Sequence, residues 1–221
     1  MSAIPFAAAP AVVSPDSAVP TLAPRRYKRV LDISLILLAL PVLLPVLVLL
    51  ALAVKLSSRG PVLFFQTRIG LNGARFRMVK FRSMYPDAEA RRAALLAQSQ
   101  RQGICFKQKN DPRVTPVGRF LRRSSLDELP QLWNVLVGDM SLVGPRPALP
   151  EEVALYTPEA AKRLAGLPGL TGLWQVSGRA DLSFEDMVAL DVAYLQTASL
   201  RSDISLILRT FGAVASGRGA Y

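Results

Sequence analysis

The sequence predicts an α+β, mainly helical protein, in which an apolar N-terminal helix and a small β-hairpin precede a helical domain at a membrane surface. Three observations support this fold class: an uncharged apolar segment at 33–54, two β-prone runs around Asn72-Gly73, and helix-like patterns with capping signals in the C-terminal third. No segment repeats at a fixed period. At 221 residues, one domain with appendages is therefore expected.

The N-terminal part divides into a tail and a membrane segment. Residues 1–24 are rich in Ala, Pro, Ser and Val and nearly uncharged, which predicts a disordered tail. The membrane segment is placed at 25–57. Its uncharged stretch, 33–54, would form a helix of roughly 33 Å, enough to cross a bilayer core. A cleavable signal is disfavoured because its apolar region is shorter, about 7–15 residues.

The topology of this segment has two interpretations. Basic side chains flank both of its ends: Arg25, Arg26, Lys28 and Arg29 before it, Lys55, Arg59 and Arg68 after it. The positive-inside bias would keep both ends in the cytoplasm. Pro41 and Pro45 predict a kink, since each removes a backbone donor and clashes with the preceding turn. A re-entrant helix that returns to the same face satisfies both facts, and a single kinked crossing is the alternative.

The remaining part, residues 58–221, is predicted to form the folded domain. Asn72-Gly73 between β-prone runs is the strongest short signal for a hairpin. A charged, Ala-rich helix is expected at 86–101. Ser183 and Asp186 form a capping-box start for a helix that runs to about 195, and a second apolar helix is expected near 203–214.

Composition restricts the chemistry. The net charge is +11, concentrated in the middle of the chain, which favours phosphate, nucleic acid or anionic lipid as partners. With one cysteine, Cys105, there is no disulfide framework within the chain. With no histidine, acid–base chemistry falls to carboxylates, and a metal would need oxygen ligands, which suits Mg²⁺.

The neighbouring carboxylates Asp127 and Glu128 have two interpretations. Ser125 and Glu128 have the spacing of a capping box, and Pro130 would place the start of the helix near Asp127. The pair would then be an ordinary helix start. Alternatively, an ionised carboxylate at this position could act as a nucleophile or hold Mg²⁺.

Several basic side chains stand at turn-like positions where guanidinium groups could hold phosphate oxygens. They are Lys80 and Arg82 after the second β-prone run, Arg122 before the acidic pair, Arg146 between Pro145 and Pro147, and Arg179 after a glycine. Each one alone could belong to a solvated basic face. Their spread over four separate places favours a shared phosphate site.

Six segments carry a resemblance to a known family. They are KRVLD with the apolar stretch that follows, GPVLFFQTRIG, KFRSM, DPRVTPVGRFLRRSSLDELPQLWNVLVGDMSLVGPRP, PGLTGLWQVSGR and SGRGAY. Together they resemble the bacterial sugar transferases, the small monotopic phosphoglycosyl transferases that include undecaprenyl-phosphate hexose-1-phosphate transferases. The resemblance runs from about Tyr27 to Tyr221.

The resemblance implies an activity and a location. Such enzymes transfer a sugar-1-phosphate from a UDP-sugar to polyprenyl (undecaprenyl) phosphate, release UMP, and begin the assembly of exopolysaccharide, capsule or lipopolysaccharide. It implies a re-entrant helix at 25–57 and a cytoplasmic catalytic domain at 58–221, with interfacial helices, on the bacterial inner membrane. Membrane lipids are expected partners and nucleic acid is not. The oligomeric state, a homo-oligomer included, and the sugar are left open, with a hexose favoured.

The resemblance also implies residue roles. Asp127 would be the nucleophile and would hold Mg²⁺, and Glu128 would assist proton removal from the lipid phosphate. Substrate and phosphate contacts would come from Lys80, Arg82, Arg122, Pro145, Arg146, Pro147, Gln175 and Arg179. The membrane helix would break at Pro41 and Pro45, although both follow leucines where the family often has Ser-Pro. The competing hypothesis is a membrane-anchored basic module that binds polyanions without chemistry, and an inactive homologue is a third.

Overall fold

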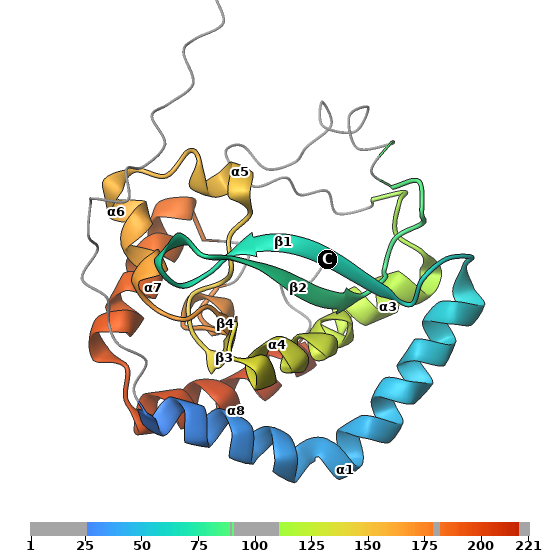
Figure 1. The fold of residues 1–221 in the computed structure, drawn as a ribbon, viewed down its shortest axis with the longest axis horizontal. Helices are drawn as coiled ribbons and strands as arrows, with labels where there is room; N and C mark the ends of the chain where they lie inside the picture. Colours follow the sequence, from blue (N-terminus) through green and yellow to red (C-terminus); the bar gives the residue numbers. More distant parts are fainter. Residues whose placement is uncertain (1–25, 89, 91–110, 179–181, 217–221) are drawn as a thin grey trace, which may run out of the picture.

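A computed structural model of the chain describes residues 26–88, 90, 111–178 and 182–216, which are mainly helical (Figure 1). The α-helices are α1 (Arg26–Ser57), α3 (Pro116–Arg123), α4 (Leu132–Val137), α5 (Pro150–Val153), α6 (Pro158–Ala161), α7 (Phe184–Thr197) and α8 (Leu200–Ser216). The 3₁₀ helices are η1 (Leu71–Gly73), η2 (Leu126–Gln131), η3 (Lys162–Ala165) and η4 (Trp174–Val176). The strands are β1 (Leu63–Ile69), β2 (Arg75–Phe81), β3 (Ser141–Val143) and β4 (Gly169–Thr171).

Helix α1 confirms the long apolar N-terminal helix. It is long and apolar enough to cross a membrane, and most of its leucines are exposed. Figure 1 shows it bent near its middle, so that its two arms run along two sides of the molecule; Pro41 and Pro45 lie in this part of the helix. The bend agrees with the loss of two backbone donors in adjacent turns.

Polar side chains dock the first arm of α1 onto the domain. The Lys28 ammonium donates to Val143 O (2.9 Å), Tyr194 Oη (2.8 Å) and Asp203 Oδ2 (2.8 Å). The Asp203 side chain is fully buried, and it also accepts from Tyr194 Oη at 2.6 Å. A second buried carboxylate, Asp32, accepts from the Leu142 amide. Buried charges are costly unless paired and hydrogen-bonded, so these contacts fix the position of the start of α1 on the surface of the domain.

Strands β1 and β2 form the predicted hairpin. They pair antiparallel, with Arg68 opposite Phe76 and Phe64 opposite Lys80. The turn contains Asn72 (φ 53°) and Gly73 (φ 81°), the left-handed conformations that Asn and Gly tolerate best. The Asn-Gly prediction is therefore confirmed.

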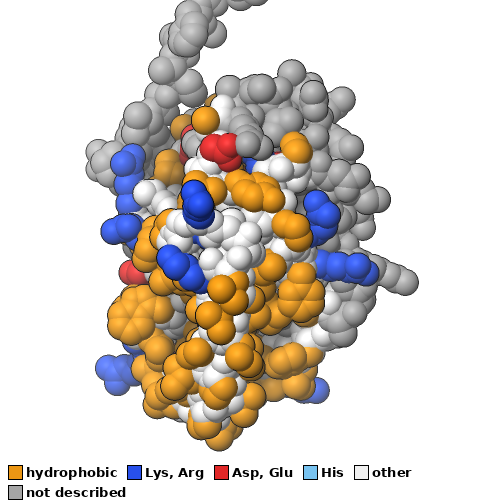
Figure 2. Space-filling view, turned by 90° about the vertical axis from the view of Figure 1, so that its right-hand side faces the viewer, with side chains coloured by type: hydrophobic (Ala, Val, Ile, Leu, Met, Phe, Trp, Pro, Cys, Tyr) orange, Lys and Arg blue, Asp and Glu red, His pale blue; other side chains and the backbone are white. Residues whose placement is uncertain are grey.

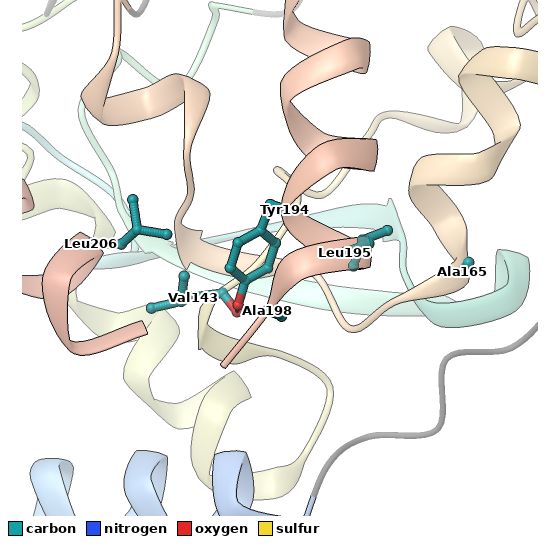
Figure 3. Close-up of a cluster of buried hydrophobic side chains, with 6 residues drawn as sticks. All are labelled: Val143, Ala165, Tyr194, Leu195, Ala198 and Leu206. Atoms are coloured by element: carbon teal, nitrogen blue, oxygen red, sulfur yellow. Dashed lines mark hydrogen bonds between the residues drawn. The ribbon is translucent and has the colours of Figure 1, made fainter. Parts of the chain in front are cut away.

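A second, short sheet is the parallel pair β3 and β4, which packs against α8, and Val143 of β3 also packs against α7. Its backbones approach so closely that a Cβ on Gly169 would lie 2.0 Å from Gly144 N. Val143 of β3 enters a buried cluster with Ala165, Tyr194, Leu195, Ala198 and Leu206 (Figure 3). The Tyr194 hydroxyl also donates to Val143 O at 3.2 Å. This cluster fixes the segment that follows β3.

Apolar side chains also cover part of the surface. Figure 2 shows hydrophobic side chains over the lower half of one face, with lysines and arginines mainly around its margins. Exposed apolar side chains on α8 recur at helical spacing, at Leu200, Ile204, Leu208 and Phe211. Trp133 on α4 is also exposed. Exposed apolar surface of this extent marks an interaction site.

The C-terminal helices agree with expectation. The Ser183 hydroxyl accepts from the Asp186 amide at 3.1 Å and caps α7, and α8 contains the predicted 203–214 segment. The helix expected at 86–101 falls mostly outside the described residues, as does the tail at 1–24.

Candidate active site

The acidic pair lies in a 3₁₀ helix, and the predicted capping box is wrong. Ser125 has a left-handed backbone (φ 56°) and makes no side-chain cap, because an N-cap requires an extended conformation. Its carbonyl instead accepts from the Glu128 amide at 3.2 Å. The chain turns at Ser125 from α3 into η2, and the α-helix α4 begins only at Leu132. Asp127 and Glu128 therefore do not begin an α-helix.

Helix η2 packs against β2, which brings Lys80 to the pair. The Lys80 ammonium bonds Glu128 Oε1 at 2.6 Å, and both side chains are largely buried. Asp127 is 8% exposed. Two carboxylates and an ammonium are thus held with little access to water, where electrostatic interactions are strong.

The pKa values of the two carboxylates are shifted in opposite directions. Burial raises the pKa of Asp127, and the Glu128 charge raises it further against the opposing effect of Lys80 and Arg122. Burial also pushes the pKa of Glu128 upward, but Lys80, Arg146 and Arg68 outweigh it and bring the pKa below its usual value. Neighbouring carboxylates thus have different electrostatic environments.

A pocket opens on the Glu128 side. It has about 220 Å³ of empty space, its open mouth included. Its polar lining consists of Arg68, Lys80, Glu128, Gln131, Arg146 and Gln175. Three cations around one carboxylate give the pocket a net positive charge, which suits an anionic ligand.

The turn that carries Arg146 is held on both sides. Gly169 of β4 donates to Pro145 O (2.8 Å), and Ile69 at the end of β1 donates to Ala148 O (2.9 Å). Arg68 donates to Pro147 O (3.1 Å). The Arg146 side chain is exposed, so an adaptable guanidinium stands on a fixed backbone.

Arg122 lies on the Asp127 side of the pair. Its Nε donates to Ser83 Oγ at 2.9 Å. Burial lowers its pKa, while Asp127 and Asp111 oppose this effect. Lys80 thus acts on both carboxylates, whereas Arg122 is a further cation for Asp127, and Arg146 and Arg68 are further cations for Glu128.

Not every predicted phosphate contact reaches the pocket. The guanidinium of Arg82 donates to Pro61 O, to Ser58 O (2.7 Å) and, more weakly, to Val54 O (3.4 Å), so it serves the C-terminal end of α1. Gln175 lines the pocket and donates to Leu170 O at 3.2 Å. Arg179 lies outside the described residues.

Arg68 is a pocket residue that the sequence analysis counted only among the basic flanks. The sequence of the hairpin could have indicated that Arg68 lies at the pocket. Residues opposite each other in an antiparallel pair share a face, and the register places Arg68, Met78 and Lys80 on one face. All three line the pocket.

The residues present are compatible with Mg²⁺. No three His, Cys, Asp or Glu side chains form a ready metal cage within the part of the chain that the structure describes. Mg²⁺ commonly uses only one or two carboxylates together with substrate phosphates and water. Asp127 and its neighbour meet that smaller requirement.

The described residues thus combine a cationic pocket beside an acidic pair with a helix long and apolar enough to cross a membrane. Comparison with known proteins gives the class: residues 23–217 match the family described as bacterial sugar transferase. The chain belongs to this family.

Three relatives illustrate the similarity. The galactosyl transferase CpsE of Streptococcus agalactiae serotype III is 45% identical over 194 residues, 87% of this chain and 43% of that protein. The exopolysaccharide production protein ExoY of Rhizobium meliloti is 41% identical over 198 residues, 88% of both chains. The UDP-glucose:undecaprenyl-phosphate glucose-1-phosphate transferase of Caulobacter vibrioides is 42% identical over 215 residues, 94% of this chain and 76% of that protein. The chain thus spans less than half of CpsE and most of the other two.

Proposed function

We propose that the chain transfers a hexose-1-phosphate from a UDP-sugar to a polyprenyl phosphate such as undecaprenyl phosphate, and so begins extracellular polysaccharide or glycoconjugate assembly. The observation that carries this proposal is the buried Asp127–Glu128 pair with cations on both sides. A pure polyanion-binding module gains nothing from two carboxylates there. The names of two relatives, a galactosyl transferase and a UDP-glucose:undecaprenyl-phosphate glucose-1-phosphate transferase, support a hexose.

In the first step, the Asp127 carboxylate attacks the phosphorus that carries the sugar. The bond from that phosphorus to the bridging oxygen breaks, and UMP leaves with the electron pair. An aspartyl phospho-sugar remains. Burial in a site lined by arginine and lysine suits this step, since preorganised cations stabilise charge that builds on the phosphate oxygens.

In the second step, an oxygen of the lipid phosphate attacks the aspartyl phosphorus and releases the Asp127 carboxylate. Glu128, held by Lys80 at 2.6 Å, accepts the proton of the lipid phosphate. The products are a polyprenyl diphosphate sugar and UMP. Mg²⁺, held by Asp127 and phosphate oxygens, would supply charge neutralisation to the diphosphate.

The location is proposed from α1 and the apolar surface. A re-entrant α1 would place the domain on the cytoplasmic face of the bacterial inner membrane, with α8 at the interface. Tags before Arg25 and after Tyr221 should both be labelled only from the cytoplasm. Periplasmic labelling of one end would show a crossing and refute the re-entrant topology.

The activity is tested directly by mixing the purified full chain with Mg²⁺, undecaprenyl phosphate and a series of UDP-sugars. Release of UMP with UDP-glucose or UDP-galactose is expected, together with a lipid-linked sugar. Omission of Mg²⁺ should abolish both. Binding to anionic vesicles without UMP release from any UDP-sugar would instead support the polyanion-binding module.

A further inference from the structure

Arg68 stands at the inner side of the pocket, at the end of β1. We propose that Arg68 binds a substrate phosphate group together with Arg146, while the same guanidinium fixes the turn that presents Arg146. This inference rests on the proposed function of the pocket. It adds a phosphate-binding and positioning residue to the site.

Arg68 is a buried cation whose hydrogen-bond donors are only partly used. Arg68 is 6% exposed. It donates to Pro147 O (3.1 Å) and to Gln66 Oε1 (2.7 Å), both neutral oxygens, and its Nε has no partner among the described residues. An arginine carries five N–H donors, and a buried charge is costly unless it meets an opposite charge. A phosphate can supply both the missing acceptor and the missing charge.

The second argument comes from the other buried arginines of the described chain. Arg113 pairs with Asp111 at 2.6 Å, and Arg163 pairs with Asp191. Arg82 meets the carbonyl oxygens at the C-terminal end of α1, where the helix dipole is negative. Arg68 makes no ion pair within the described residues. Its position at the pocket explains this difference if an anionic ligand completes the site.

The third argument is the crowding of positive charge. Burial lowers the pKa of Arg68 to about 10, and the neighbouring Arg146 lowers it as well. Glu152 and Glu128 oppose this shift, but Glu152 Oε2 accepts from the Leu149 amide and Glu128 is bonded to Lys80. Two guanidinium groups around one pocket repel each other until an anion lies between them. A phosphate with two negative charges fits this arrangement through paired N–H donors.

Two phosphate-bearing substrates enter this site in the proposed reaction: the UDP-sugar with its diphosphate and the lipid with its monophosphate. Their chemistry toward Arg68 is the same. Separate half-reactions distinguish them, because the first releases UMP without the lipid. Loss of the UMP burst assigns Arg68 to the donor, whereas a raised KM for undecaprenyl phosphate with an intact burst assigns it to the acceptor.

The test uses the full chain with three substitutions. Arg68→Gln removes the charge, and Arg68→Lys keeps a buried charge but loses the planar fork of N–H donors that can reach Pro147 O and a phosphate in different directions. Arg75→Gln is the matched control, because Arg75 is an exposed arginine of the same hairpin. Loss of one charged hydrogen bond predicts a fall of roughly 10- to 100-fold in one half-reaction for Arg68→Gln, a smaller fall for Arg68→Lys, and none for the control.

A comparison of KM with kcat separates phosphate binding from a purely structural role. Loss of a phosphate contact at Arg68 should raise the KM of one substrate, whereas partial unfolding would lower kcat and leave KM unchanged. Arg75→Gln should change neither.

Two kinetic results would overturn the inference: half-reaction kinetics of Arg68→Gln equal to those of Arg75→Gln, or full activity in Arg68→Lys when Arg68→Gln merely unfolds. Failure of the proposed function is a different outcome, in which the wild type releases no UMP. Thermal unfolding with added inorganic phosphate then still tests Arg68. Phosphate should raise the Tm of the wild type and of Arg75→Gln but not of Arg68→Gln, and an equal rise in all three would refute the phosphate site.

Discussion

The two sides of the acidic pair differ in what surrounds them. On the Asp127 side, the carboxylate is buried near Arg122, which is itself bonded to Ser83. On the Glu128 side, a pocket opens between Lys80, Arg68 and Arg146. Neighbouring residues of one 3₁₀ turn thus experience opposite shifts in pKa. The two carboxylates are therefore not equivalent, and a substitution can remove either one while the other side chain stays in place.

The largest effect is expected on the Asp127 side. Asp127→Asn keeps the shape of the side chain but cannot form the aspartyl intermediate, so UMP release should fall by roughly three orders of magnitude or more. Single-turnover UMP release measures this. The Tm should stay near that of the wild type, which separates chemistry from folding. Turnover within tenfold of the wild type would exclude Asp127 as the nucleophile.

The matching change on the Glu128 side should affect the other half-reaction. Glu128→Gln removes the proton acceptor, and the lipid-dependent step should slow by about 10²- to 10⁴-fold while the UMP burst survives. The Glu128 charge raises the pKa of Asp127, so its removal lowers that pKa. Because Asp127 acts as a carboxylate, the acidic limb of the burst should move to lower pH. An unmoved limb would contradict the coupling of the two sides.

A smaller effect is expected at the pocket mouth. Arg146→Lys keeps the charge but loses the planar fork, and should slow the reaction by roughly 10- to 100-fold. The UMP burst without lipid tells whether the donor or the acceptor is affected. Arg123→Lys, an exposed change on α3, is the control. Equal rates for both variants would show that Arg146 belongs only to a basic face.

The smallest catalytic effect is expected away from both sides. Arg82 serves the end of α1, so Arg82→Gln should leave UMP release within about threefold of the wild type. Loss of its hydrogen bonds to the helix end should lower the free energy of unfolding by about 1–3 kcal/mol. Urea unfolding measures this change. A large loss of turnover at unchanged stability would instead support the prediction that Arg82 contacts a substrate phosphate.

Local signals were sufficient for much of the fold. Asn72-Gly73 predicted the hairpin, the central prolines predicted the bend of α1, and Ser183 predicted the start of α7, because each acts through its own or adjacent backbone. The capping box at Ser125 failed because η2 packs against β2, and a distant contact decided the local conformation. Tertiary packing commonly overrides such local preferences.

In the candidate site, too, some features follow from the local sequence and others depend on distant contacts. The acidic pair and the Pro145–Pro147 turn could be found from the sequence, because two adjacent carboxylates and an arginine between two prolines are recognisable without the structure. Arg82 and Arg68 could not be told apart as basic residues, because their roles depend on what lies beside each strand end. Arg82 meets the end of α1, whereas Arg68 meets the turn after β3. The hairpin register could have indicated Arg68 through the face it shares with Lys80.

The contact between Lys28 and Asp203 has a consequence for biosynthesis. The two residues are 175 positions apart, and the ribosome adds roughly 5–20 residues per second. About 10–35 seconds therefore pass between synthesis of the ammonium and synthesis of its carboxylate. Throughout that interval Lys28 of α1 cannot pair with Asp203, because Asp203 has not yet been synthesised. We therefore expect the apolar part of α1 to enter the membrane before this ion pair forms. Docking of the domain onto the start of α1 then becomes a late step, completed only after the Asp203 part of α8 has been synthesised.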